Sequence, residues 1–203
     1  MYFRAFYWRI PLKSGKAPFI SEDELQYILD SLQGQHLLRN KVVILFSHFL
    51  GLRAKELASL TIEDVYDQNK KCIKETIRLL GKMTKGNKYR EVFLVDPYVR
   101  ELVKRYLFEN RNVNDLKAPL FLSQKGGAFS ANTMQRMIAN IYKSVGVKAS
   151  SHSGRRSFAT RLIRKNVDIY SIQQLMGHSS IITTQVYFSS DPNRLKAAIS
   201  HLS

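Results

Sequence analysis

Three short segments in the last two thirds of the chain carry the residues that most constrain it. They read GLRAKEL (residues 51–57), HSGRR (152–156) and GHSSIITTQVY (177–187). Together they supply four basic side chains and a tyrosine: Arg53, His152, Arg155, His178 and Tyr187. His152 lies three residues before Arg155, and the tyrosine follows His178 by nine. Each segment offers a hydrogen-bond donor or a nucleophile suited to a phosphodiester, so a fold that uses them must bring the three together.

Breaking a phosphodiester without a metal builds negative charge on the nonbridging oxygens, and preorganised cations must meet that charge. Arginine suits this role, because its planar guanidinium binds two oxygens at once and stays protonated. Arg53 and Arg155 are the candidates. A tyrosine hydroxyl is a weak nucleophile at neutral pH, and the departing 5′-oxygen needs a proton. His152, His178 and a lysine are available to share that work.

The second segment is predicted to begin a helix. Apolar residues recur after it at helical intervals, at Phe158, Ala159, Leu162 and Ile163. His152 and Arg155 then fall at the helix start, and their spacing lets both face one ligand. The free N–H groups and dipole of a helix amino end also attract phosphate. An HxxR pair alone is more typical of a solvated helix start, so this interpretation depends on the other two segments.

The first segment is predicted to form a buried corner. Residues 42–50 are nearly all apolar and indicate a helix, Gly51 suits a left-handed helix stop, and Ala54 begins another helix. Arg53 would lie between the two helices. In the third segment, serines and threonines at 179, 180, 183 and 184 start or punctuate a short helix. Its apolar face, Ile181, Ile182 and Val186, is expected to hold the tyrosine close to His178.

Between these segments the pattern predicts a small sheet and further helices. Residues 76–80 and 91–95 indicate paired strands that flank a polar run, and residues 120–122 indicate another short strand. Ser21 and Glu24 form a predicted capping box, Pro97 opens a helix, and Ser130 or Asn132 opens another. The predicted fold class is α+β, mainly α-helical with a small antiparallel β-sheet.

Composition independently indicates a nucleic-acid partner. The 32 Lys and Arg residues against 16 Asp and Glu give a formal net charge of +16 and a pI near 10.0. The chain has no glycine-rich phosphate loop and no His, Cys and carboxylate cluster at metal-ligand spacing. Its single cysteine, Cys72, excludes an internal disulfide and is expected to pack in the strand region, in a reducing compartment. The opening MYFRAFYWRI is short and interrupted by Arg4 and Arg9, which argues against a signal peptide or a membrane span.

Taken in order, the three segments resemble the catalytic domain of the tyrosine recombinases, the integrase family that cuts and rejoins DNA through a phosphotyrosine. The resemblance runs from about residue 21 to 187. It implies that Tyr187 attacks the scissile phosphate, that Arg53, Arg155 and His178 stabilise that phosphate, and that His152 assists proton transfer or orientation. It also implies that Glu56 supports the site; the alternative is an ordinary helix carboxylate that pairs with Lys55 or Arg53.

The family places its catalytic lysine in the turn of a β-hairpin. The segment KGNKYREVFL resembles that hairpin, and Lys85, which opens it, is the lysine implied to protonate the leaving 5′-oxygen. Lys82 and Lys88 compete for this role, and a hairpin that merely holds DNA would make all three phosphate contacts. The DNA-binding candidates are Lys82, Lys88, Arg90 and Arg156.

The resemblance implies one catalytic domain over residues 1–203, with a basic arm at 1–19 and a C-terminal helix at 191–203. That helix either docks on its own domain or is exchanged into a neighbouring protomer, which would link four subunits on two duplexes. Many family members carry a helical core-binding domain before the catalytic one, and this interpretation takes it as absent. Gly154 departs from the leucine of many members and is interpreted as tolerated.

The predicted function is site-specific DNA recombination: integration, excision or inversion through a 3′-phosphotyrosyl intermediate. Such chemistry needs no cofactor, neither ATP nor a divalent metal. The expected partner is double-stranded DNA with paired recombination sites, bound by a homotetramer whose subunits are monomers when free. The expected location is cytoplasmic, with the nucleoid in a prokaryote. A type IB topoisomerase and a noncatalytic DNA-binding regulator are the alternatives.

Overall fold

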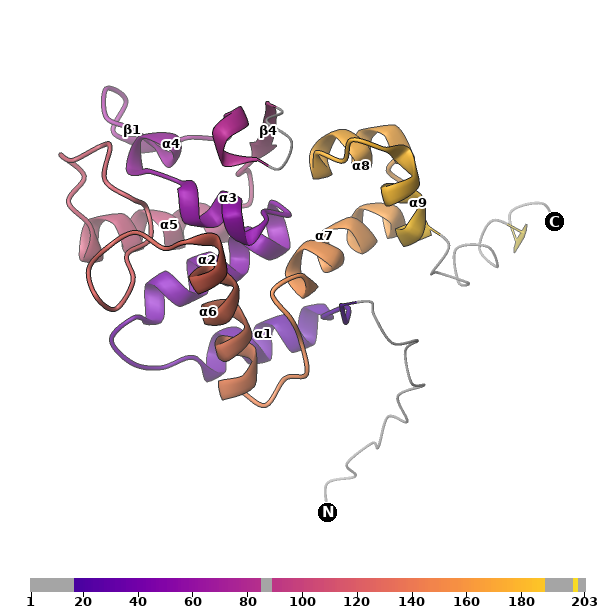
Figure 1. Cartoon of the computed structure of the whole chain (residues 1–203), viewed down its shortest axis with the longest axis horizontal. Coiled ribbons are helices and arrows are strands. Elements are labelled where there is room, and N and C mark those ends of the chain that lie inside the picture. The colour runs from indigo at the N-terminus through magenta and orange to yellow at the C-terminus, as the bar shows by residue number, and fades with distance from the viewer. Residues whose placement is uncertain (1–16, 85–88, 189–198, 201–203) are drawn as a thin grey trace, which may run out of the picture.

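A computed structural model of the chain describes residues 17–84, 89–188 and 199–200. In these residues the fold is mainly helical, with two small antiparallel hairpins, as the sequence predicts. The helices, coloured along the chain in Figure 1, are α1 (Glu22–Ser31), α2 (Leu37–Phe49), α3 (Ala54–Ser59), α4 (Ile62–Val65), the 3₁₀ turn η1 (Gly81–Met83), α5 (Pro97–Asn110), α6 (Ala131–Ser144), α7 (Ser153–Arg164), α8 (Ile169–Met176) and α9 (Ile181–Phe188).

Local capping explains where several helices begin. The Ser21 hydroxyl accepts a hydrogen bond from the Glu24 backbone at 3.1 Å, and the Glu24 carboxylate accepts one from the Ser21 backbone at 3.0 Å. Asp96 caps α5 ahead of Pro97, and Ser130 caps α6. The predicted starts of these three helices are therefore confirmed.

The two hairpins are β1 (Tyr66–Asp67) with β2 (Cys72–Ile73), and β3 (Thr76–Leu79) with β4 (Arg90–Phe93). The pairing of the second hairpin was predicted, and the structure gives its register, in which Thr76 pairs with Phe93. Two other expectations were wrong. Residues 120–122 form only part of an isolated bridge, Leu122 to Ala128, because the chain there is mostly irregular. Cys72 does not pack inside; it is exposed on the two-residue β2, which is too short to be covered.

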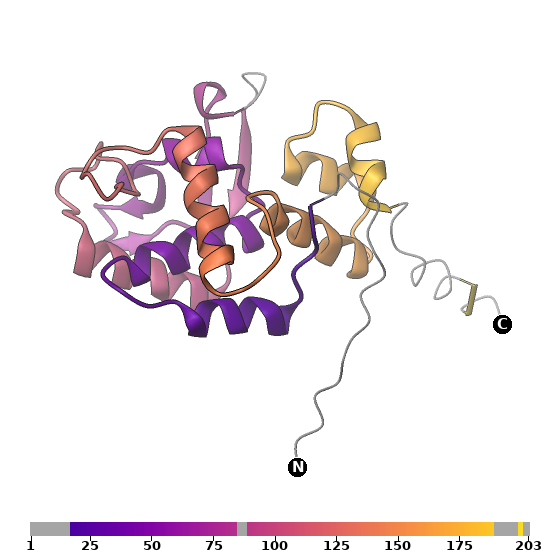
Figure 2. The same cartoon turned by 60° about the horizontal axis from the view of Figure 1, so that its bottom comes forward.

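The apolar residues divide into a large core and a small one. The large core joins α1–α6 and both hairpins, whereas the small cluster consists of Ala159, Ile163, Ile172 and Met176. Figures 1 and 2 show the lobe of α7, α8 and α9 (orange to yellow) beside the larger body. α2 packs against α7 and joins the two parts. Among the described helices, none is long and apolar enough to cross a membrane.

Gly154 sits where α7 meets α2, and the structure requires a glycine there rather than merely tolerating one. A Cβ at this position would lie 2.4 Å from the Ser47 Oγ and 2.9 Å from both the Ser47 Cβ and the His48 Cδ2. The neighbouring serine and histidine are themselves buried. A leucine, which the resemblance would place here, would not fit against this α2.

We expect Gly154→Ala to lower the free energy of unfolding by about 1–3 kcal/mol, because the added methyl overpacks the α2–α7 contact. Ser47→Ala removes the nearest atom. The Ser47 Oγ is buried without a hydrogen-bond partner in the described residues, so its loss alone should cost little. The double variant should recover part of the loss in urea unfolding. A Gly154→Ala protein as stable as wild type would contradict the close contact.

Candidate active site

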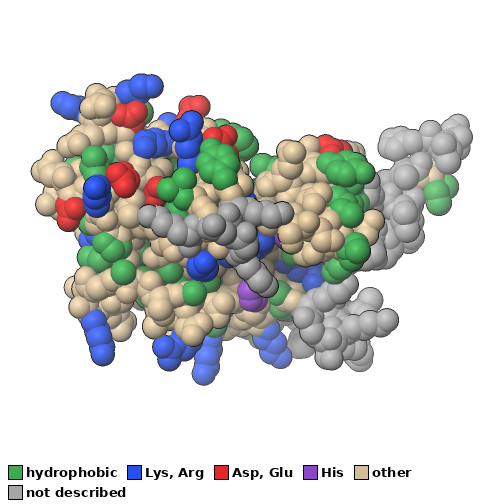
Figure 3. All heavy atoms as spheres, turned by 45° about the horizontal axis from the view of Figure 1, so that its top comes forward, with side chains coloured by type: hydrophobic (Ala, Val, Ile, Leu, Met, Phe, Trp, Pro, Cys, Tyr) green, Lys and Arg blue, Asp and Glu red, His purple; other side chains and the backbone are tan. Residues whose placement is uncertain are grey.

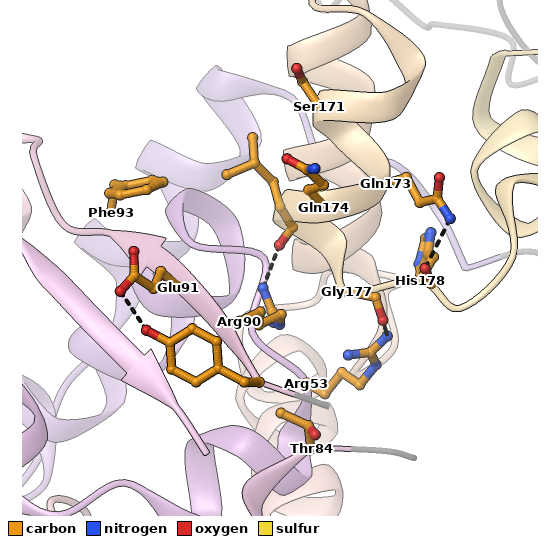
Figure 4. Close-up of a pocket in the computed structure, with 12 residues that line it drawn as sticks. Arg53, Thr84, Arg90, Glu91, Phe93, Ser171, Gln173, Gln174, Gly177 and His178 are labelled. Carbon is orange, nitrogen blue, oxygen red and sulfur yellow. Dashed lines mark hydrogen bonds between the residues drawn. The ribbon is translucent and has the colours of Figure 1, made fainter. Parts of the chain in front are cut away.

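Arg53 lies at the corner that the sequence predicts, as the residue before α3. Gly51 takes a left-handed φ of 62° between the two helices, where a Cβ would strike the Phe158 ring at 2.4 Å. The Arg53 backbone N–H donates to Glu56 Oε2 at 2.7 Å, and its Nη1 donates to Glu56 Oε1 at 2.9 Å. Its Nη2 donates to the Gly177 carbonyl at 3.1 Å (Figure 4). Arg53 therefore spans α3 and the end of α8.

Glu56 is fully buried and lies beneath this corner. It pairs with Arg53 and with Arg90, whose Nη2 donates to Oε2 at 2.7 Å, while Lys55 donates instead to the Thr84 carbonyl. Burial alone would raise the pKa of Glu56, but Arg90 and Arg155 outweigh burial and lower it. Glu56 is thus the carboxylate that orders two guanidinium groups.

The structure buries Arg90, which the sequence suggests as a DNA-binding candidate. It is buried, with 7 % of its surface exposed. One end of its guanidinium holds Glu56, and the other donates to the Leu175 carbonyl at the end of α8. Figure 4 shows Arg90 reaching from β4 toward that helix. It ties the second hairpin to both α3 and α8, which a local pattern could not indicate.

Arg155 lies still deeper. Its two Nη atoms donate to the Gly51 and Met176 carbonyls, so the guanidinium joins the turn after α2 to the end of α8. Burial, then the charges of Arg53 and Arg90, lower the pKa of Arg155 to about 9. It stays protonated at neutral pH. A buried cation beside two others is costly unless an anion approaches.

His152 differs from Arg155 in burial, since the arginine is buried and the histidine is not. It directly precedes α7 and is exposed. Its backbone N–H donates to the Ser150 Oγ at 3.3 Å, and its carbonyl accepts from the Arg156 backbone N–H at 3.0 Å. Arg156 is half-buried. Neither residue lines the cleft described below. Lys85 and Lys88 lie outside the described residues, as does the side chain of Lys82.

His178 and Tyr187 lie together, as their spacing suggests. Their rings are nearly parallel, 3° apart in plane, with centroids 6.1 Å apart. The tyrosine packs against the small apolar cluster rather than against the face predicted for it. Two residues of that face are exposed, Ile182 at 68 % and Val186 at 42 %, because α9 turns Thr184 inward, where it is fully buried.

Arg53, Arg90, Gly177 and His178 help to line a cleft of about 700 Å³ between β4 and the end of α8, whereas Arg155 and Tyr187 are not among its lining residues. Figure 3 shows blue and purple side chains where the larger body meets the lobe of α7–α9. Burial, then Arg155, Arg53 and Arg90, lower the pKa of His178 to about 4, so this ring is neutral at pH 7. Three guanidinium groups then face one carboxylate. The surplus positive charge makes the site suited to an anion. In the part of the chain described, no three His, Cys, Asp or Glu side chains gather as a metal site would need.

Glu56→Gln should lower the free energy of unfolding by about 3 kcal/mol at pH 7, because Arg53 and Arg90 lose their paired carboxylate and Arg155 loses a neighbouring negative charge. The pKa of Glu56 is lower in the folded protein than its ordinary value of 4.5. Its contribution to the free energy of unfolding is therefore complete above pH 4.5 and is lost as the pH falls through the folded pKa. The difference in free energy of unfolding between wild type and Glu56→Gln, measured with urea, should therefore become smaller in acid. An equal gap at pH 7 and pH 3 would argue against the pairing.

Known proteins resemble this chain in sequence and in fold. Residues 18–194 match the model of the phage integrase family. The chain is 30% identical over 196 residues to tyrosine recombinase XerH of Campylobacter jejuni, across 92% of this chain and 52% of that protein. The crystal structure of XerA recombinase superposes with a TM-score of 0.72 at 27% identity, covering 91% of this chain and 64% of the other. The crystal structure of XerH bound to a palindromic difH substrate, a post-cleavage complex, superposes with a TM-score of 0.69 at 30% identity. The match covers 95% of this chain and 56% of that one. The chain spans about half the length of the curated relative.

Proposed function

The chain belongs to the phage integrase family, and on that premise we propose that it is a site-specific recombinase that cleaves and rejoins duplex DNA. One observation carries the proposal: two guanidinium groups pair with one buried carboxylate, and the charge of a third acts on it, beside a histidine that stacks on a tyrosine. The arginines offer donors and charge to a phosphate, and the tyrosine offers a nucleophile at the same place.

In the proposed reaction, the Tyr187 hydroxyl gives its proton to His152 or to water, and its oxygen attacks the phosphorus of the scissile diester and forms a 3′-phosphotyrosyl bond. The bond from phosphorus to the 5′-oxygen breaks, and that oxygen leaves as a hydroxyl after it takes a proton. Arg53 and Arg155 meet the charge that develops on the nonbridging oxygens. A 5′-hydroxyl from a partner strand then attacks the same phosphorus and releases the tyrosine. The energy of the first bond is kept, so strand exchange consumes no ATP.

The roles of three further residues belong to this proposal. Lys85 would protonate the leaving oxygen, with Lys82 and Lys88 as the alternatives in the same turn. His152 would assist from the start of α7, where it is exposed to an incoming DNA backbone. The proposed partner is duplex DNA with paired sites, bound by four subunits; among the similar structures, XerH is described as bound to its difH substrate. We also propose residues 1–203 as one catalytic domain, whose C-terminal helix at 191–203 falls largely outside the described residues.

The test is a search for the covalent intermediate. The protein is incubated in EDTA with a pool of nicked duplexes of varied core sequence, on which cleavage releases a short strand and traps the enzyme. We expect a protein–DNA adduct on a denaturing gel, and transfer of the trapped strand to a second duplex. Relaxation of a plasmid without strand transfer would indicate a topoisomerase. Tight DNA binding without any adduct would overturn the proposal and favour a noncatalytic regulator.

A further inference from the structure

One buried hydroxyl lies between the helix of Tyr187 and the ring of His178. Thr184 is fully buried, and its Oγ1 is 2.9 Å from the His178 Nδ1. The threonine precedes the tyrosine by three residues on α9, so both lie on one side of that helix. The histidine comes from the turn between α8 and α9. One short helix therefore holds the nucleophile and also touches the back of the imidazole.

Donor and acceptor accounting assigns the proton on this ring. A hydroxyl has one hydrogen to donate, and a neutral imidazole has one N–H and one acceptor nitrogen. In the described part of the chain, the Thr184 hydroxyl has no hydrogen-bond partner besides the His178 Nδ1. If Nδ1 carried the proton, the hydroxyl would accept, and its own hydrogen would be buried without an acceptor, at a cost of about 1–3 kcal/mol. If Nδ1 is unprotonated, the hydroxyl donates to it and no buried donor is left without an acceptor.

The second arrangement leaves the proton on Nε2. His178 lines the cleft, and its Nε2 makes no hydrogen bond within the described residues. The charged and titratable groups that face this ring are Arg53 before α3, Arg90 on β4, Arg155 on α7 and Tyr187 on α9. Three of them are cations. A protonated, positively charged His178 would add a fourth cation at an energetic cost, whereas a neutral ring that donates from Nε2–H adds no charge.

We propose that Thr184 is a positioning residue that holds His178 in its Nε2–H tautomer, so that the neutral ring donates a hydrogen bond to a nonbridging oxygen of the scissile phosphate. This inference rests on the proposed function for its ligand, and on the local contacts for its tautomer. Without the hydroxyl, the ring can also carry its proton on Nδ1. Nε2 then becomes an acceptor, it cannot donate to the phosphate, and the transition state is less stabilised.

Nitrogen NMR of the imidazoles tests the tautomer directly. The chain has five histidines, and the His178 signals are those that disappear in His178→Gln. At pH 7 we expect a protonated Nε2 and a bare Nδ1 in wild type. Thr184→Ser, which keeps the hydroxyl, should show the same pattern, whereas Thr184→Val, which keeps the shape alone, should show a mixture. A wild-type ring protonated at Nδ1 would overturn the proposal whatever the activity.

Single-turnover cleavage of nicked duplex tests the consequence. We expect Thr184→Val to form the phosphotyrosyl adduct about tenfold more slowly than wild type, which is less than the hundredfold or greater loss from removing a transition-state donor. Thr184→Ser should restore the rate to within about twofold, and DNA affinity should be alike in all three, while the valine variant should melt slightly lower because it loses one buried hydrogen bond. Equal rates in valine and serine variants would overturn the proposal. A wild type without any adduct would count against the proposed function instead, and the NMR signals would still show whether Thr184 holds the ring.

Discussion

Tyr187→Phe should abolish the covalent protein–DNA adduct, with a loss of cleavage rate beyond a thousandfold, since removal of a nucleophile has cost on the order of 10⁶ in other enzymes. The phenyl ring retains the ring contacts through which Tyr187 stabilises the fold. It can still stack on His178 and pack against the small cluster of the α7–α9 lobe. Only the hydroxyl is lost, so folding and DNA affinity should match wild type. The measurement is adduct formation on nicked duplex, beside a binding titration.

A matched control is available on the preceding helix. Tyr170 on α8 is 70 % exposed and lies outside the lining of the cleft. Tyr170→Phe makes the same chemical change and should leave the adduct yield within about twofold of wild type. If Tyr187→Phe still formed an adduct, another residue would be the nucleophile. If both variants lost it equally, the effect would be on folding or binding rather than on chemistry.

The sequence predicts the local features of this fold well because their causes lie within a few residues. The Ser21–Glu24 capping box, the left-handed Gly51 and the start of α5 each depend on neighbouring side chains alone. The association of His178 with Tyr187 was also predicted, since nine residues that include one helix bring them together.

What the sequence did not predict depends on how distant elements pack. Arg90 and Glu56 are 34 residues apart, and a basic residue in a polar hairpin gives no sign that it will be buried against a carboxylate of α3. The same holds for the inward side of α9: isoleucine and valine suggest the buried face, whereas Thr184 occupies it because His178 offers its hydroxyl a partner. The three-residue spacing from Thr184 to Tyr187 was the available signal, and only the structure shows what the threonine touches.

Arg155→Lys should reduce the rate of adduct formation by about a hundredfold to a thousandfold while leaving DNA affinity nearly unchanged. Lysine keeps the charge, so the long-range attraction to DNA is preserved. Lysine cannot keep the two-pronged hydrogen bonding of the guanidinium, because a single ammonium does not reach both the Gly51 and the Met176 carbonyls as the two Nη atoms do. The turn after α2 and the end of α8 would lose their shared anchor, and the phosphate would lose a planar donor.

The measurement is single-turnover cleavage at saturating protein, so that a change in affinity cannot pass for a change in rate. Arg164→Lys is the matched control, since Arg164 lies on the same helix, is exposed and stacks over Phe19 rather than facing the cleft. That variant should cleave within about twofold of wild type. An Arg155→Lys rate within tenfold of wild type would mean that charge alone suffices at this position. The geometric role of the buried guanidinium, on which the proposed phosphate site depends, would then be wrong.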